Sequence, residues 1–267
     1  MAAAIVTKKQ AITLAHIAAG TRSFDITMPK EINRLVIDGL SDILFTAGFS
    51  NNSIANKEGA ELSKVYMVGN ILIDNIRYNR ERVEGMRLND IDALAGLPLK
   101  EGSYIVFTLN RKALLADQEN LEKMLRVLCE TAGDLPIIAP LRDSAVQVIM
   151  ALGLKKNISL HNLHIVKPLN YLQFAYLTSH AQGIVTDSGN VAEEATFNNI
   201  PCITLNSYTE HIETVKVGSN VLVGEDAELL RSAFTDMVSG TWKKCGIPDR
   251  WDGRSAERIV QILLERR

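Results

Sequence analysis

The feature that most constrains the fold of this chain is the alternation of short apolar runs with segments of helical periodicity. The apolar runs are typical of buried strands and lie at 13–17, 43–46, 65–68, 104–108, 136–139, 163–166, 183–186 and 202–205. Apolar residues at helical spacing lie at 2–10, 121–130, 227–238 and 256–264. This alternation predicts an α/β protein in which helices pack on parallel sheets.

A polar stretch at 78–102, which contains the helix breaker Gly96-Leu97-Pro98, separates two strand-rich regions. The second region has enough alternating elements for a complete doubly wound, Rossmann-like domain. The first opens on a helix-like segment, although a Rossmann-like domain normally begins with a strand and a glycine-rich turn. We therefore predict a partial N-terminal Rossmann-like domain at 1–80, a junction at 81–102, a complete Rossmann-like domain at 103–250 and a C-terminal helix at 251–267.

Charge and composition exclude several classes of partner. The formal net charge is −2 and the basic residues are scattered, so we expect neither nucleic acid nor a membrane surface as a partner. No apolar stretch reaches the roughly 20 residues that span a bilayer. The three cysteines are Cys129, Cys202 and Cys245, without CxxC pairing, which favours a reducing, cytoplasmic location. We expect no metal site and no cofactor, and we interpret His161, His164 and His180 as structural or surface residues.

The strongest motif is the run Asp187-Ser-Gly-Asn-Val-Ala-Glu-Glu194, which follows a predicted strand and opens a helix. Free backbone amides and the helix dipole at Ser188 and Gly189 favour an anion such as a phosphate. Glu194, farther along the helix, can accept hydrogen bonds from ribose hydroxyls. Alternatively, Asp187 and Ser188 are an ordinary N-cap, and Glu193 and Glu194 lie on a solvated helix face.

Six segments in this order resemble the non-hydrolysing UDP-N-acetylglucosamine 2-epimerases over nearly the whole chain. They are His16-Ile-Ala-Ala-Gly-Thr-Arg22, Pro29-Lys-Glu-Ile-Asn-Arg34, Val68-Gly-Asn-Ile-Leu-Ile-Asp74, Thr186–Ala195, Thr209-Glu210 and Asp252-Gly253 with Glu257-Arg-Ile-Val260. The resemblance implies a GT-B-like fold: here, one complete Rossmann-like domain and an incomplete first one. It also implies that UDP or UDP-GlcNAc is the ligand.

The resemblance assigns the UDP site residue by residue. Ser188, Gly189 and Glu194 are expected to contact the diphosphate and ribose, Phe174 to pack on the uracil, and Arg111 to lie in the same site. A flat apolar ring suits a base, although the spacing of Phe174 from Tyr171 also fits a helix core position. The substrate cleft is expected to contain His16, Arg22, Glu31, Arg34, Glu210 and His211.

Several positions depart from the family pattern. The reaction implied by the resemblance removes the C2 proton, eliminates UDP and adds it back with inverted C2, so it needs an acid and a base. Ala18 and Lys30 replace carboxylates, and Asn110 replaces a histidine. Neither alanine nor asparagine can exchange a proton in this way. Asn206 and His211 stand where the family has arginines, and Arg142 stands where it has a further histidine.

Three hypotheses follow. In the first, the chain is an epimerase that converts UDP-GlcNAc to UDP-ManNAc for surface polysaccharide; because its acid–base groups are substituted, we expect impaired catalysis. It is a non-catalytic UDP-sugar-binding or partner-docking paralogue. Or it is a truncated gene product. We expect an open strand edge near residues 1–45, covered by a second copy or by a complementing chain.

Overall fold

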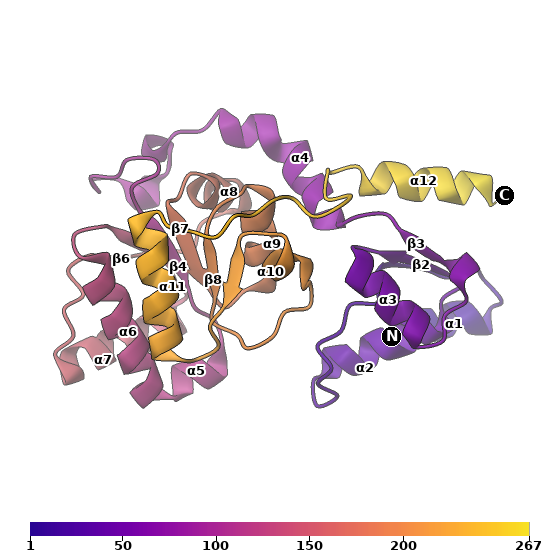
Figure 1. Cartoon of the computed structure of the whole chain (residues 1–267), viewed down its shortest axis with the longest axis horizontal. Coiled ribbons are helices and arrows are strands. Elements are labelled where there is room, and N and C mark those ends of the chain that lie inside the picture. Colours follow the sequence, from indigo (N-terminus) through magenta and orange to yellow (C-terminus); the bar gives the residue numbers. More distant parts are fainter. Residues whose placement is uncertain (267) are drawn as a thin grey trace. The chain divides into compact units, whose positions relative to one another are not determined.

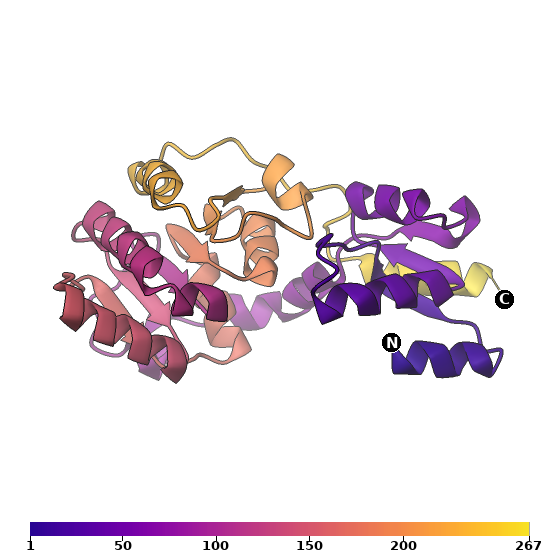
Figure 2. The same ribbon diagram turned by 90° about the horizontal axis from the view of Figure 1, so that it is seen from below.

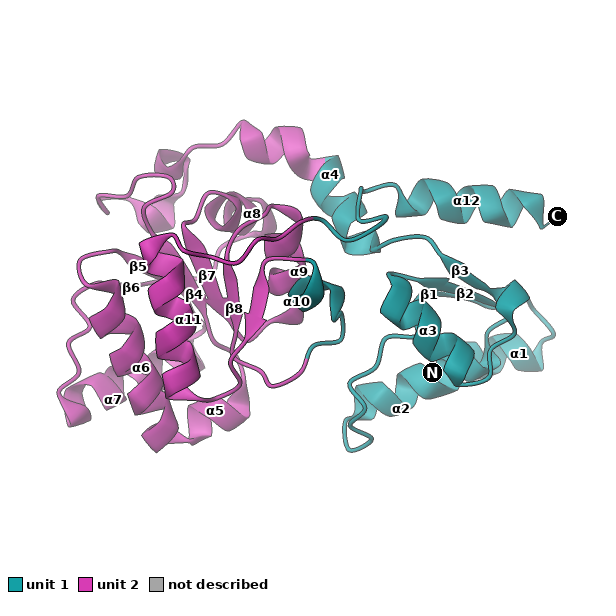
Figure 3. Ribbon diagram, in the orientation of Figure 1, with its two compact units in different colours: residues 1–78, 209–217, 247–267 teal, residues 79–208, 218–246 magenta. Residues whose placement is uncertain are grey.

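The computed structural model describes residues 1–266, which form two compact units. Unit 1 comprises residues 1–78, 209–217 and 247–267, and unit 2 comprises 79–208 and 218–246 (Figure 3). Two segments that we expected in the second domain, 209–217 and 247–250, pack instead with unit 1. Among the residues described, no helix is long and apolar enough to cross a bilayer.

Unit 1 is built on a three-stranded parallel sheet of order β1-β2-β3. Its elements are α1 (Ala2–Lys9), β1 (Ala15–Ala19), α2 (Pro29–Leu40), β2 (Ile43–Thr46), α3 (Phe49–Lys57), β3 (Val65–Met67), the start of α4 (Ile71–Glu84), α10 (Glu213–Lys216) and α12 (Ser255–Glu265). Figure 1 shows α12 on one face of this sheet and α2 and α3 on the other. The predicted strands at 43–46 and 65–68 and the predicted helices at both chain ends are confirmed, and β1 lies two residues later than the strand predicted at 13–17.

The family-like segments 68–74 and 252–260 fix α12 to unit 1. The carboxylate of Asp74 accepts hydrogen bonds from the amides of Ser255 at 3.1 Å and Ala256 at 2.7 Å, which are free donors at the start of α12. Arg258 donates to the carbonyl of Val68 at 2.9 Å. On the sheet, Ile259 joins a buried apolar cluster with residues of β2. These segments are therefore structural in this chain.

Unit 2 contains a six-stranded parallel sheet of order β6-β5-β4-β7-β8-β9. Its elements are β4 (Ile105–Thr108), α5 (Lys112–Ala116), α6 (Gln118–Ala132), β5 (Ile137–Pro140), α7 (Asp143–Lys156), β6 (Leu163–Val166), α8 (Tyr171–Ser179), β7 (Gly183–Thr186), α9 (Gly189–Phe197), β8 (Cys202–Thr204), β9 (Asn220–Leu222) and α11 (Ala227–Ser239). The strand order reverses beside β4. Ligands of such sheets bind at the carboxyl ends of the strands next to the reversal.

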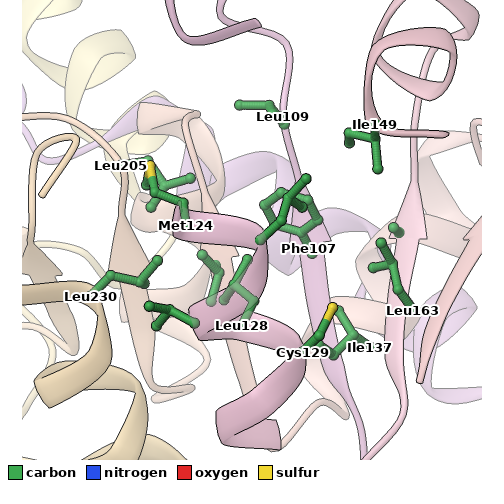
Figure 4. Packing of buried hydrophobic residues seen from close by; sticks show 14 of the residues in the cluster. Phe107, Leu109, Met124, Leu128, Cys129, Ile137, Ile149, Leu163, Leu205 and Leu230 are labelled. Atoms are coloured by element: carbon green, nitrogen blue, oxygen red, sulfur yellow. The ribbon is translucent and has the colours of Figure 1, made fainter. Parts of the chain in front are cut away.

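Two apolar clusters cover the two faces of this sheet. The larger cluster packs α6, α7 and α11 on one face, around Phe107, Leu128 and Phe234 (Figure 4). The smaller one packs α8 and α9 on the other face, around Tyr104 and Ile184. Figure 2 shows the helices of unit 2 on both sides of its strands. The complete doubly wound domain predicted from the sequence is thus confirmed as an α/β fold with a parallel sheet.

Candidate functional site

The carboxyl ends of β4 and β7 meet at one edge of the unit 2 sheet, and Asp187 holds the loops that follow them. Its Oδ2 accepts the backbone amide of Asn110 at 2.6 Å and that of Arg111 at 2.5 Å. At the ends of the same two strands, the hydroxyls of Thr108 and Thr186 form a hydrogen bond of 2.6 Å. Asp187 therefore fixes the position of a neighbouring loop and does not cap α9.

The N-terminus of α9 is open. Ser188 occupies the N-cap position, yet its side chain makes no capping hydrogen bond, and its amide donates to Thr186 Oγ1 at 3.0 Å. A Cβ placed on Gly189 would meet no atom within 4 Å. The amides of the first turn thus face free space, where the helix dipole favours an anion. Free amides at the start of a helix are the donors that phosphate groups bind in many proteins.

Glu194 lies inside the fold. Glu194 is 8% exposed and Glu193 is 7% exposed. The alternative interpretation, in which both glutamates lie on a solvated helix face, is therefore wrong. In the part of the chain that the structure describes, no group bonds to the Glu194 carboxylate. Burial first, and then the charge of Glu193, raise the pKa of Glu194 to about 7. A largely buried carboxylate that no group within residues 1–266 binds, and whose oxygens are not fully enclosed, is typical of a ligand site.

Arg111 brings a cation to the same edge, but its guanidinium is bound by the chain itself. Nη1 donates to Asn206 Oδ1 at 2.7 Å and lies 2.9 Å from a carboxylate oxygen of Glu225. Asn206 in turn donates to the carbonyl of Asp187 at 3.1 Å. Asn206, which stands in place of a family arginine, therefore fastens the loop after β8 to the loop after β7.

Phe174 lies on α8 and is half-buried. It packs against the smaller apolar cluster of unit 2, which also contacts Val191 in the first turn of α9. The ring is thus near the elements that form the open helix start, while part of it serves the core. Both interpretations made from the sequence, base stacking and core packing, remain compatible with this position.

In unit 1, Arg22 and His16 belong to a buried network around Asp38. Arg22 lies 2.7 Å from Asp38 and bonds to both carboxylate oxygens of Glu58, at 3.0 and 2.5 Å. His16 Nδ1 lies 2.5 Å from the other oxygen of Asp38. These bonds keep the pKa of Asp38 below its usual range, against the opposing effect of burial. Asp38 and Glu58 could not be predicted as members of this network, because neither lies in a recognisable sequence motif.

The remaining predicted cleft residues also hold loops in place. Glu31 is 2% exposed and accepts the amides of Ser23 and Phe24. Glu210 accepts hydrogen bonds from Arg34 and Lys30. Burial is the largest single effect on the pKa of Glu210 and raises it, but the two cations together outweigh burial and lower the pKa to about 2.

His211 is buried in unit 1 and contacts two residues from distant parts of the sequence. Its Nδ1 lies 3.3 Å from Asn51 Oδ1. Its ring meets that of Trp251 edge-on, with centroids 6.0 Å apart. His211 thus packs the segment 209–217 onto unit 1.

The substituted positions differ in environment. Ala18 is exposed, with a φ of 63°, at a bulge where β1 and β2 shift register between Ile17 and Ala19. Asn110 is held through its backbone, and Lys30 is paired with Glu210. No cluster of three or more His, Cys, Asp or Glu residues that could hold a metal ion occurs within residues 1–266.

Comparisons with known proteins agree with this architecture. The family model described as UDP-N-acetylglucosamine 2-epimerase matches residues 1–264. The UDP-N-acetylglucosamine 2-epimerase of Methanocaldococcus jannaschii is 35% identical over 98% of this chain and 72% of its own length. A UDP-2,3-diacetamido-2,3-dideoxy-D-glucuronate 2-epimerase of Pseudomonas aeruginosa is 33% identical over 99% of this chain and 72% of its own.

Solved structures give the same answer. The M. jannaschii UDP-GlcNAc 2-epimerase in complex with UDP-GlcNAc and UDP is similar with a TM-score of 0.81 and 34% identity, over 98% of this chain and 72% of that one. The Neisseria meningitidis enzyme bound to UDP-GlcNAc has a TM-score of 0.83 and 26% identity, over 99% and 73%. The fold is thus α/β, with parallel sheets, and GT-B-like. On the family match and these relatives together, the chain belongs to the UDP-N-acetylglucosamine 2-epimerase family.

Proposed function

We propose that unit 2 binds the UDP part of a UDP-N-acetylhexosamine and that the chain is impaired as an epimerase. The observation that carries the first half is Glu194, a buried carboxylate without a partner, on the helix whose N-terminus is open. The hydroxyl of Ser188 and the amides from Gly189 onward would donate to the diphosphate, and Glu194 would accept hydrogen bonds from the ribose hydroxyls. Phe174 would stack on the uracil. The relatives solved with UDP-GlcNAc support this ligand class.

The second half of the proposal rests on the substituted side chains. Ala18 carries no ionisable group, and Asn110 cannot take or release a proton near neutral pH. Lys30 reverses a charge and is engaged by Glu210 at 2.5 Å. A general acid or base typically contributes a factor of ~10²–10⁴ in rate. Several such losses together would leave little conversion of UDP-GlcNAc to UDP-ManNAc for surface polysaccharide.

The alternative function is a paralogue that binds a UDP-sugar, or docks to a partner, without catalysis. The unpaired Glu194, taken together with the substituted acid–base positions, favours it over a fully active enzyme. We place the protein in the cytoplasm, since all three cysteines are free thiols and two of them are buried. We further propose that a second copy or a complementing chain covers the outer edge of β1.

Calorimetry with UDP tests the binding proposal. We expect Glu194→Ala to weaken UDP binding by roughly tenfold or more, because hydrogen bonds to a charged acceptor contribute about 1.5–3 kcal/mol. Ser188→Ala is expected to bind UDP less tightly as well. The matched control is Glu130→Ala, which removes an exposed carboxylate from α6 of the same unit. Equal heats for all four proteins would refute the pocket assignment.

Incubation with UDP-GlcNAc in deuterated water tests the catalytic proposal. We expect no deuterium at sugar C2 and no UDP-ManNAc from the unaltered chain. The combined variant Ala18→Glu, Lys30→Glu and Asn110→His restores the family side chains and is expected to exchange faster than the parent. Exchange by the unaltered chain at the rate of an active relative would overturn the impairment while leaving UDP binding unaffected.

A further inference from the structure

Two cationic side chains of α2 bind a carboxylate of the chain itself. Glu210 Oε1 accepts from Lys30 Nζ at 2.5 Å and from Arg34 Nη1 at 2.9 Å, and its Oε2 accepts from Arg34 Nη2 at 2.7 Å. Paired donors from one guanidinium match the two oxygens of a carboxylate or phosphate. The three side chains all belong to unit 1.

Lys30 and Arg34 are unfavourably placed without an anion. They lie four residues apart on one helix, where like charges repel. Lys30 is also in the first turn of α2, where the helix dipole disfavours a cation. Glu31 lies 3.7 Å from Arg34, but the amides of Ser23 and Phe24 already bind its carboxylate. The pair is therefore suited to an oxyanion, and Glu210 supplies one.

Glu210 is also placed so that it can leave. It lies in an irregular segment before α10, and its carboxylate is held by the two cations of α2. Its side chain is 23% exposed and that of Lys30 is 53% exposed, so solvent reaches the contact. Neighbouring bonds, such as that of the His211 amide to Thr209 Oγ1, fix the backbone independently of Glu210. Rotation of one side chain would vacate the position.

We propose that Lys30 and Arg34 form a binding site for the carboxylate or phosphate group of a small acidic ligand, which displaces the carboxylate of Glu210. The site lies in unit 1 and uses no residue of the nucleotide site in unit 2. Arg34 and Glu210 are also among the residues expected in the substrate cleft, so the proposal names the charge of a group that this cleft would take, and it does not rest on UDP binding by unit 2. Glu210 acts as an internal competitor, which lowers the apparent affinity for the external anion.

Calorimetry on the full chain tests this, with inorganic phosphate and D-glucuronate as probes and D-glucose as the neutral control. UDP is kept in excess at constant ionic strength, so that any nucleotide site is filled and does not contribute. We expect Glu210→Gln to bind phosphate or glucuronate at least roughly tenfold tighter than the parent chain, because the competing charge is gone. The tighter of the two probes identifies the ligand group, and glucose is expected not to bind.

The matched variants at position 30 decide whether the gain arises at this site. In the Glu210→Gln background, Lys30→Met is expected to abolish the gain and Lys30→Arg to keep it. If Glu210→Gln does not fold, the same two substitutions in the parent chain decide: Lys30→Met must weaken anion binding and Lys30→Arg must not. Affinity in Glu210→Gln no higher than in the parent, or insensitive to Lys30→Met, overturns the proposal.

Discussion

Glu194 is a carboxylate whose charge the fold of unit 2 does not compensate. Because burial raises its pKa to about 7, the ionised form destabilises the folded state. Its stabilising contribution is complete below the unfolded pKa of about 4.5 and is lost as the pH rises through 7. We expect Glu194→Gln to be more stable than the parent by up to about 3 kcal/mol at pH 8 and by less than about 1 kcal/mol at pH 5.

Urea unfolding of both proteins at the two pH values checks this, because other groups that titrate cancel in the difference. A gain of the same size at pH 5 and pH 8 would show that packing, and not ionisation, separates the two proteins. Excess UDP is expected to shrink the gain of the variant at pH 8, since a bound ribose would satisfy the carboxylate of the parent only.

Ala18 keeps a backbone conformation that costs an ordinary residue roughly 1 kcal/mol or more. Its φ of 63° lies at the bulge of β1, and the side chain is exposed. We expect Ala18→Gly to raise the unfolding free energy by about 0.5–1 kcal/mol and Ala18→Val to lower it by about 1–2 kcal/mol. Urea unfolding measures both. A stabilising Ala18→Val would contradict the strain.

At the scale of elements, α12 depends on a residue from another helix. Asp74 of α4 accepts the first free amides of α12, which has no side-chain cap of its own. We expect Asp74→Ala to cost about 1–2 kcal/mol and to speed hydrogen exchange throughout α12. Glu257→Ala is the control, because that exposed side chain contributes little. Unchanged exchange in α12 of Asp74→Ala would rule out this capping role.

The positions of helices and strands could be predicted from the sequence where the pattern of apolar residues is local. Contacts between segments far apart in the sequence could not be predicted. The α12 helix and strand 183–186 are visible as apolar periodicity. Strand β9 was missed, since it has three residues and begins with the polar Asn220. The open start of α9 followed from Ser188 and Gly189, and their binding roles remain predictions. The bonds from Asp187 to the amides of 110 and 111 span more than 70 residues, which no local pattern encodes.

At the scale of the whole molecule, unit 1 is assembled from three separate segments of sequence. Trp251 is buried and donates to the carbonyl of Ala47 at 3.0 Å, 204 residues away. Glu213 similarly bonds to the amide and hydroxyl of Ser50 at the start of α3, at 2.8 and 2.5 Å. Loop closure over such separations has to precede these contacts. Unit 1 is therefore complete only when its last segment has been added, which explains why its extent could not be predicted from composition.

The outer edge of β1 leads to the last prediction. This strand pairs with β2, and within residues 1–266 no other strand pairs with it. Large apolar side chains are exposed close by in sequence: Ile17 is 45%, Ile12 57% and Val6 59% exposed. Unpaired backbone groups beside apolar surface favour association.

We expect light scattering to give a mass above that of the monomer, and we expect Ile17→Lys to shift this mass towards that of the monomer. Leu154→Lys, at an 83% exposed position in unit 2, is the control and should not. A parent chain that stays monomeric at every concentration would leave β1 without a partner strand and sink the idea.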